Sequence, residues 1–307
     1  MMLQVAPLVF TDDRLALKGG TAINLFLREM PRLSVDLDLA FTDYRLGRIE
    51  ALEAINDANR VTESRLKARG FQTQIATTRD GIEAKLLVRR GNIEVKVETN
   101  YVIRGSVNSP RLASLASKAK DFLLADLEIP FLSAEDIYGG KLVAALDRQH
   151  PRDLFDVMQL FDNGGITPDI RRSFVVYLAS HNRPLHEVLF PTERDVSHEY
   201  ETIFRGMTTE SVELSELLAI RTRLLDELPR SLSSIERRFL VSLANVEPRW
   251  DLIDVPHLQE LPAVRWKLQN LETLRRRDPA KFHHQADGLA RRIDALPPRP
   301  DGESDDG

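Results

Sequence analysis

A glycine pair near the start of the chain, Gly19-Gly20, stands between a short apolar segment and a helical pattern. Leu15–Leu17 before the pair predicts a strand, and the apolar spacing over Thr21–Met30 predicts a helix. The alternating segment Val35–Phe41 then predicts a second strand. A strand that turns through glycine into a helix and returns as a strand must layer that helix against a sheet. This order of elements predicts an α/β core for the first third of the chain.

Two aspartates lie two positions apart in the second predicted strand. Successive side chains of a strand point to opposite faces, so Asp36 and Asp38 should share one face, about 7 Å apart along the strand. Carboxylate oxygens suit Mg²⁺ or Mn²⁺, which leaves part of its coordination shell to water and substrate phosphates. The exposed backbone N–H groups of Gly19-Gly20 can receive those phosphates. The two segments together predict nucleotidyl transfer, although an isolated Asp-x-Asp is also typical of solvated or capping residues.

Further helix and strand signals follow before residue 114. Arg48–Arg69 predicts a long helix with an apolar stripe, and Gly70 ends it. Three strands are predicted after it, of which the last two form a hairpin: Phe71–Thr77, Ile82–Arg89 and Ile93–Thr99. Glu98 lies on the polar face of the last strand and is a candidate third metal carboxylate. The alternative is a solvated edge strand whose Glu and Lys side chains pair in water.

From about Ser114 the strand signals fade and helical spacing takes over. Ser133 resembles an N-cap, and it opens a helix through Lys141. Later helices are predicted at Arg152–Phe161, Ile170–Leu178, Glu210–Leu228, Ser233–Ala244 and Val264–Arg276. We therefore predict an α/β core over residues 1–112, a helical domain over residues 113–296 and a disordered tail over residues 297–307, which is rich in Pro, Gly and acid.

A second charged cluster lies on two consecutive predicted helices. Asp153 and Asp156 are three positions apart and share a helix face, and Lys141 comes from the preceding helix. Lysine or arginine offsets charge on a leaving pyrophosphate, and a carboxylate can position or deprotonate an acceptor hydroxyl. Arg152 is a further candidate for phosphate contact. Taken alone, the cluster is more typical of an ordinary interhelical salt-bridge network than of a catalytic site.

Composition limits the remaining possibilities. The chain of 307 residues has no cysteine, which excludes disulfides and thiolate metal sites and is compatible with a reducing cytoplasm. The start lacks the pattern of a signal peptide, and no apolar run is long enough to span a membrane. We expect a soluble cytoplasmic protein. A net charge of −5 argues against a uniformly basic surface but leaves room for a local basic groove among 42 Lys and Arg residues.

These segments together resemble one protein family. The order Leu17-Lys18-Gly19-Gly20-Thr21-Ala22, Arg32-Leu33-Ser34-Val35-Asp36-Leu37-Asp38-Leu39, Lys96-Val97-Glu98, Lys141-Leu142 and Arg152-Asp153-Leu154-Phe155-Asp156 is similar to the AbiEii toxin family of nucleotidyltransferases. The segment Leu261–Leu271 resembles that family's closing helix. The resemblance spans nearly the whole chain apart from the tail.

The resemblance implies an α+β fold: a polymerase-β-like nucleotidyltransferase domain with a mixed sheet, followed by a helical C-terminal domain. It also implies a toxin of a toxin–antitoxin or phage-defence system, with a separate antitoxin as partner. Such a toxin uses a nucleoside triphosphate (NTP) with Mg²⁺ and modifies RNA, most plausibly the 3′ end of tRNA, which would block translation.

By the same resemblance, residues of this chain take defined roles. The triphosphate would contact Lys18, Gly19, Gly20, Thr21, Ser34 and Arg152. Asp36 and Asp38 would hold the metal, with Glu98 as a third carboxylate, and Lys141, Asp153 and Asp156 would complete the catalytic set. Two alternatives stay open: transfer of a nucleotide to a protein or small molecule, and a catalytically silent module that binds a nucleotide or a partner.

Overall fold

The computed structural model describes residues 1–10, 12–77 and 85–297, and within them the chain divides into two compact units. The first unit comprises Met1–Ile137 together with Met207–Glu210, and the second comprises Tyr138–Gly206 and the residues from Ser211 onward. The boundary predicted after residue 112 differs from this division and falls inside the first unit. Of the predicted tail, residues 298–307 lie outside the described residues.

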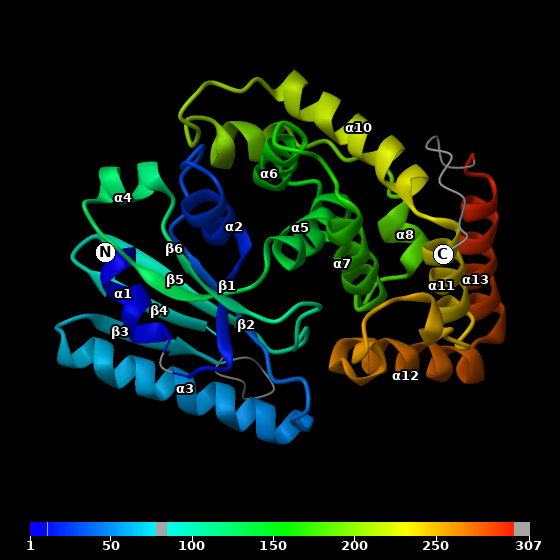
Figure 1. Ribbon diagram of the computed structural model, residues 1–307, viewed down its shortest axis with the longest axis horizontal. Helices are drawn as coiled ribbons and strands as arrows, with labels where there is room; N and C mark the ends of the chain where they lie inside the picture. Colours follow the sequence, from blue (N-terminus) through cyan, green and yellow to red (C-terminus); the bar gives the residue numbers. More distant parts are fainter. Residues whose placement is uncertain (11, 78–84, 298–307) are drawn as a thin grey trace. The chain divides into compact units, whose positions relative to one another are not determined.

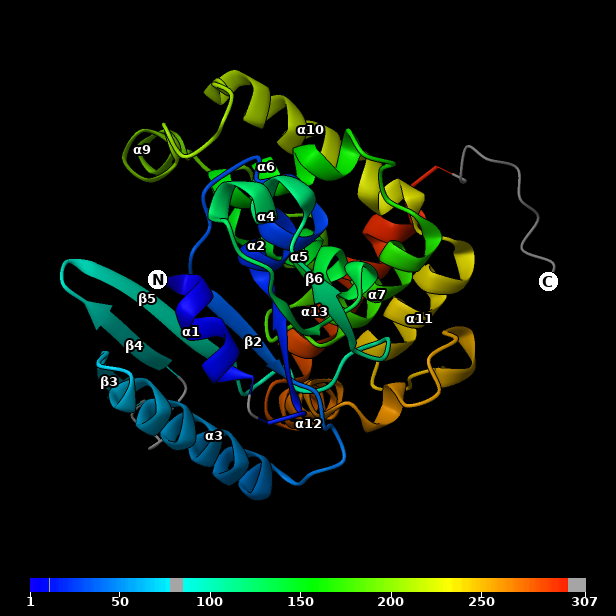
Figure 2. The same cartoon turned by 60° about the vertical axis from the view of Figure 1, so that its left-hand side comes forward.

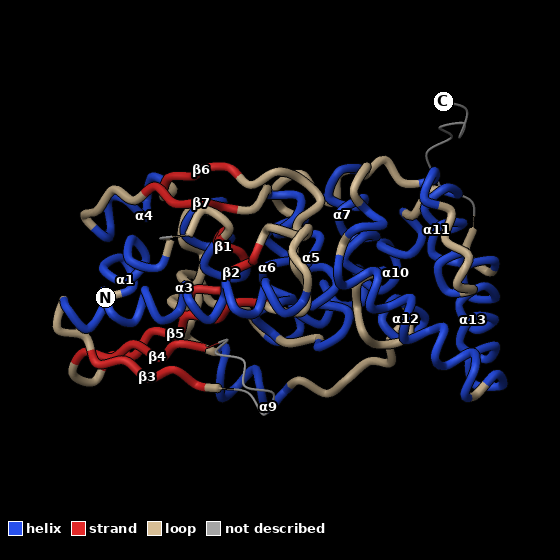
Figure 3. Tube along the Cα trace, turned by 90° about the horizontal axis from the view of Figure 1, so that it is seen from below, coloured by secondary structure: helices blue, strands red, loops and turns tan. Residues whose placement is uncertain are grey.

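One mixed sheet of seven strands forms the centre of the first unit, and Figure 3 shows its strands in red. Its order is β3-β4-β5-β2-β1-β7-β6. The strands are β1 Leu15–Lys18, β2 Leu37–Phe41, β3 Gln72–Ala76, β4 Lys85–Arg90, β5 Ile93–Asn100, β6 Arg111–Ser114 and β7 Glu128–Phe131. β2 runs antiparallel to β1 and parallel to β5, so the carboxyl-side end of β1 lies beside the start of β2.

The strand assignments differ from the sequence-based prediction mainly at β6 and β7. The prediction had the chain helical from about Ser114, yet β7 pairs with both β1 and β6. β7 has four residues, of which Ile129 and Phe131 are buried, so its period-2 signal is too short to distinguish from a loop. Because β6 and β7 complete the sheet, the first unit extends to Ile137. Residues 82–84 of the predicted strand Ile82–Arg89 lie outside the described residues.

The first unit also contains helices, of which α2 and α3 contact the sheet directly. The helices are α1 Met2–Val9, α2 Gly19–Ala22, the π-helical η1 Ile23–Leu27, α3 Arg48–Ala68 and α4 Ser117–Leu123. Figures 1 and 2 show α3 running alongside β3. α3 contacts both β3 and α1. The buried stripe of α3 contains Ala51, Ile55 and Ala58, whereas Ile49, expected in the stripe, is 73% exposed. The small alanine side chains let α3 pack closely on its neighbours. A count of apolar residues in the sequence does not reveal this.

The second unit is helical. Its helices are the greater part of α5 Ala134–Arg148, then α6 Pro151–Phe161, α7 Pro168–Ala179, α8 Leu185–Leu189, α9 Ser197–Glu199, η2 Tyr200–Phe204, α10 Leu214–Ser231, α11 Ser234–Ala244, η3 Trp250–Leu252, η4 Leu258–Glu260, α12 Pro262–Arg277 and α13 Pro279–Asp294. Each later predicted helix is present. In the part of the chain that the structure describes, we find no helix with both the length and the apolar character of a membrane span.

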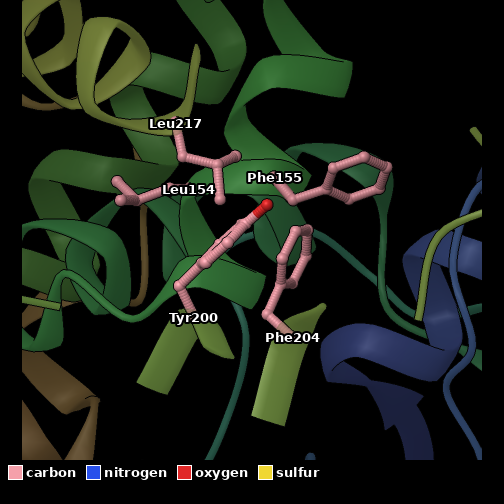
Figure 4. Close-up of a cluster of buried hydrophobic side chains, with 5 residues drawn as sticks. All are labelled: Leu154, Phe155, Tyr200, Phe204 and Leu217. Atoms are coloured by element: carbon pink, nitrogen blue, oxygen red, sulfur yellow. The ribbon is translucent and has the colours of Figure 1, made fainter. Parts of the chain in front are cut away.

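A buried apolar cluster joins α6, η2 and α10 within the second unit. Figure 4 shows the side chains of Leu154, Phe155, Tyr200, Phe204 and Leu217 directed toward one another. The rings of Phe155 and Phe204 lie 5.7 Å apart between centroids, and the hydroxyl of Tyr200 donates to the carbonyl of Val212. Leu154 and Phe155 lie between Asp153 and Asp156 in sequence, so this cluster fixes the helix that carries both carboxylates.

Candidate functional site

The glycine pair forms the turn from β1 into α2, as predicted. Gly19 has φ +78°, which is the left-handed region that favours glycine. A Cβ at Gly19 would lie 2.3 Å from Oδ2 of Asp38, so the carboxylate packs directly on the backbone of the turn. Any larger residue would displace that side chain. Gly19 is therefore required twice, for its backbone conformation and for the close approach of Asp38.

The second glycine packs against an arginine and a serine. A Cβ at Gly20 would lie 2.8 Å from Nη2 of Arg32 and 3.0 Å from Oγ of Ser34. Asn24 is fully buried, and its Nδ2 donates to the carbonyl of Gly20 at 2.9 Å. Asn24 was not among the site residues predicted from the sequence. Its spacing of four residues from Gly20 on a helical pattern is the signal that could have found it.

Hydroxyl groups link the start of α2 to the segment before β2. The Oγ atoms of Thr21 and Ser34 lie 3.1 Å apart, and the Thr21 hydroxyl also donates to the carbonyl of Asp36 in a short hydrogen bond. Thr21 is buried, which favours this polar link over contact with water. The structure thus brings together the predicted residues Gly19, Gly20, Thr21, Ser34 and Asp38.

Lys18, Asp38 and Glu98 lie side by side on three neighbouring strands. Asp38 on β2 is the register partner of Lys18 on β1 and of Glu98 on β5. Directly paired residues of adjacent strands point to the same face of a sheet. The carboxylate of Glu98 forms a half-exposed ion pair with Lys85 at 2.9 Å. In the described residues, no group of three Asp, Glu, His or Cys side chains is arranged as a metal site.

Asp36 lies one residue before β2 rather than within it. One of its carboxylate oxygens is 3.4 Å from the backbone nitrogen of Lys96 in β5. The predicted strand began at Val35, which is instead 40% exposed. Asp36 and Asp38 therefore flank Leu37, which is fully buried; the carboxylate of Asp38 lies at the glycine turn, and that of Asp36 lies beside the backbone of β5. Oxygen donors of this type fit a divalent cation such as Mg²⁺.

The predicted residues of the second unit form a buried ion network between α5 and α6. Nζ of Lys141 lies 2.7 Å from Oδ1 of Asp153 and 2.9 Å from Oδ2 of Asp156. Arg148 pairs with the other oxygen of Asp153 at 2.7 Å. Lys141 is 8% exposed, Asp153 is 3% exposed and Asp156 is fully buried. Lys141 and the more exposed Arg148 balance the two buried carboxylates, which removes much of the cost of burying them.

The surroundings of Asp153 keep it ionised. Burial alone would raise the pKa of this carboxyl, but Lys141 and Arg148 outweigh burial and lower the pKa to about 2. A carboxylate with so low a pKa is a weak proton acceptor. Its contribution is to hold and orient Lys141. Burial also lowers the pKa of His150, which caps α6 by accepting a hydrogen bond from the backbone N–H of Arg152 at 3.1 Å.

A buried aspartate three residues after Ser133 organises a loop of the first unit. Asp136 is 1% exposed, and its carboxylate accepts hydrogen bonds from the backbone N–H groups of Val107 and Asn108 at 2.7 and 2.9 Å. Ser133 contributes its hydroxyl at 2.8 Å. Buried carboxylates are held in this way by several donors. No local pattern in the sequence announces the contact, because its partners are distant along the chain.

Comparison with known proteins identifies the family. The family model described as the nucleotidyl transferase AbiEii toxin of type IV toxin–antitoxin systems matches residues 2–270. The chain belongs to the AbiEii toxin family. It is therefore a nucleotidyltransferase toxin of a type IV toxin–antitoxin system, which implies a nucleotide substrate and an antitoxin partner. The resemblance inferred from the motifs is confirmed.

A solved structure supports the fold. The chain is similar to MenT4, a nucleotidyltransferase toxin from Mycobacterium tuberculosis, with a TM-score of 0.55 and 23% sequence identity over 88% of this chain and 89% of that one. A likeness at this identity concerns the fold, and it confirms the α+β nucleotidyltransferase class predicted from the sequence. No curated protein sequence matches the chain significantly.

Proposed function

We propose that this AbiEii toxin transfers a nucleoside monophosphate from an NTP to RNA, most plausibly to the 3′ end of tRNA, and thereby blocks translation in the cytoplasm. The observation that carries the proposal is the contact of Asp38 with the backbone of Gly19 at the glycine turn. Phosphates bind to backbone N–H groups where a strand turns into a helix. A carboxylate beside such a turn would hold a divalent cation, whose positive charge offsets that of a bound triphosphate.

The residues of the first unit fit a divalent cation by their donor chemistry, and Asp36 and Asp38 would hold it, with Glu98 as a third candidate. A bound Mg²⁺ or Mn²⁺ would supply positive charge to the phosphates and stabilise the charge that develops during transfer. Gly19, Gly20, Thr21 and Ser34 would position the triphosphate, with Lys18 as a further phosphate contact. Thr21 supports this role because it fixes Ser34 and the backbone of Asp36.

The reaction itself is a displacement at the α-phosphate. The acceptor hydroxyl forms a bond to that phosphorus and gives up its proton to solvent. The bond between the α-phosphorus and the oxygen that bridges to the β-phosphate breaks, and that oxygen leaves with pyrophosphate. Lys141 would contribute charge stabilisation, Asp153 and Asp156 would orient its ammonium group, and Arg152 would contact phosphate. The ion pairs of Lys141 with both aspartates support an orienting role. The acidic pKa of Asp153 argues against its use as the general base.

Substitution of the two aspartates tests the proposal. The double variant Asp36→Ala and Asp38→Ala, incubated with labelled NTP, Mg²⁺ and total RNA, should lose transfer by at least about 1000-fold, because charge stabilisation at the phosphates is lost. Thermal melting should show that the variant still folds. Replacement of Glu94 by Ala, at a partly exposed position of β5 where Glu94 pairs with Arg89, is a control that should keep activity. Full activity of the double variant would reject the site.

The acceptor is tested in the same assay. If the wild-type protein labels no RNA but does label a protein or a small molecule, the proposal of an RNA acceptor is wrong, and the proposal of nucleotidyl transfer is retained. If no acceptor is labelled under any condition, a catalytically silent module becomes the better account.

A further inference from the structure

A basic cleft lies in the second unit between α11, η3 and the end of α13. Its volume is about 580 Å³, which is within the usual range of about 300–1,000 Å³ for small-molecule sites. Arg237 and Arg238 come from α11, and Arg249 precedes η3. Val241, Leu252 and Ile293 supply apolar lining. None of the predicted catalytic residues lines this cleft.

The arginines differ in how far their charge is already balanced. Arg249 forms an exposed bidentate pair with Asp251, at 3.0 and 2.8 Å. Arg237 is half-buried and donates to the backbone carbonyls of Arg230 and Pro297. These carbonyls orient its guanidinium. Arg238 is exposed, and Asp294 is the acidic residue of the lining. Three arginines and one aspartate therefore line the cleft, and Asp251 pairs with one of the arginines, Arg249.

An apolar lining beside arginines suits a nucleotide unit of single-stranded RNA. Nucleobases stack on apolar and guanidinium surfaces, and arginine forms paired hydrogen bonds with phosphate oxygens. An acidic peptide would satisfy the arginines but would not require space for a base. We propose that this cleft is a binding site for a phosphate-bearing nucleotide of the acceptor RNA, separate from the residues that carry out transfer. The proposal deepens the proposed function and rests on RNA as the acceptor.

Direct binding tests the cleft without relying on catalysis. The probe is unfractionated tRNA, titrated against the full chain at several salt concentrations. The variant Arg238→Gln with Arg249→Gln should bind roughly tenfold more weakly, and the slope of log affinity against log salt should fall by about 1.4 to 1.8, since two phosphate contacts are lost. The change Asp251→Asn should act in the opposite direction and tighten binding, because it releases Arg249.

A matched control corrects for net charge. Arg60→Gln with Arg65→Gln removes two exposed arginines from α3 and should leave tRNA affinity nearly unchanged. If the cleft variant binds as tightly as this control, the cleft is not an RNA site. If polyglutamate displaces tRNA from the wild-type protein as well as a single-stranded RNA of equal charge does, the surface is a general anion or acidic-peptide site, and the proposal is overturned.

Transfer kinetics separate this proposal from the proposed function. With labelled NTP, the cleft variant should raise the KM for tRNA about tenfold and leave kcat unchanged, whereas loss of Asp36 and Asp38 should abolish kcat. An unchanged KM rejects the cleft and leaves the proposed function intact. If the wild-type protein labels no RNA, the proposed function fails, and the binding titration still decides whether the cleft holds RNA.

Discussion

At the scale of single residues, Asp153 illustrates how burial and charge combine. Its pKa falls from an ordinary 3.8 to about 2 because Lys141 and Arg148 outweigh the cost of burial. A carboxyl whose pKa is lower in the folded state stabilises the fold above pH 3.8 and loses that contribution as the pH falls toward 2. The network is therefore acid-sensitive within this window.

We predict that Asp153→Asn lowers the free energy of unfolding by about 2 kcal/mol at neutral pH, since a shift of one pKa unit corresponds to about 1.4 kcal/mol. Between pH 5 and pH 2.5 the wild-type protein should lose stability more steeply than the variant. Urea unfolding at a series of pH values measures both slopes. Identical slopes would mean that Asp153 does not titrate with a lowered pKa in the folded protein.

Single residues also show what the sequence can reveal. Gly19, Gly20 and Asp38 were predicted to lie together, because the turn and the alternating strand are local patterns, and the family resemblance added Thr21 and Ser34 to them. Arg32 belonged to a motif of the family resemblance, but its packing on Gly20 joins residues twelve positions apart and was not predicted. The hydrogen bonds that Asp136 accepts across the first unit also bridge distant segments, which no single-sequence pattern describes.

At the scale of elements, the turn between β1 and α2 can be tested by comparing two glycines. Gly19 and Gly70 have nearly the same φ, +78° and +77°, but only Gly19 has a side chain against its Cα. Gly19→Ala should lower nucleotide transfer about 100-fold, because displacement of a positioning group by about 1 Å has effects of this size.

The matched change Gly70→Ala carries the same backbone strain of about 1 to 2 kcal/mol but should leave transfer within about twofold of the wild-type rate. Thermal melting and a labelled-NTP assay on both variants separate strain from displacement of Asp38. Equal losses of activity in the two variants would argue against a role for the contact between Asp38 and Gly19.

Two adjacent glycines of α5 provide a second comparison. A Cβ at Gly139 would lie 2.7 Å from the backbone nitrogen of Phe174 on α7, whereas one at Gly140 would meet nothing within 4 Å. Gly139→Ala should destabilise the protein by about 1 to 3 kcal/mol through overpacking. Gly140→Ala should stabilise it by up to about 1 kcal/mol, because alanine favours a helix over glycine.

Chemical denaturation of both variants measures the difference. Since the two residues immediately precede Lys141, the pair also reports how firmly α5 holds that lysine. If Gly139→Ala is as stable as Gly140→Ala, α5 does not pack on α7 at Gly139.

Elements were predicted well where their pattern was long. The helices that became α6, α7, α10, α11 and α12 have apolar spacing over several turns, which a single sequence reveals. The short strand β7 and the helix α1 were missed. β7 has only four residues, and α1 is almost uniformly apolar and contains Pro7, so neither shows a clear period. Part of the predicted helix Thr21–Met30 is the π-helical η1, and an apolar pattern with a period of 3.6 residues does not distinguish a π-helix from an α-helix.

At the scale of the whole molecule, family membership and fold follow from motif order, and acceptor identity does not. The match over residues 2–270 covers both compact units, so the family relation applies to each. The same phosphate chemistry serves any hydroxyl acceptor, and for this reason the sequence could predict nucleotidyl transfer but left RNA, protein and small molecules open.

The position of the isotope distinguishes nucleotidyl transfer from other reactions of an NTP. In parallel reactions with Mg²⁺ and tRNA, one NTP carries its label on the α-phosphate and the other on the γ-phosphate. The account predicts that the α-label becomes attached to the 3′ end of tRNA while the γ-label is released as pyrophosphate. Transfer of the γ-label to any acceptor, or release of the γ-label as inorganic phosphate with no α-label on RNA, would contradict it.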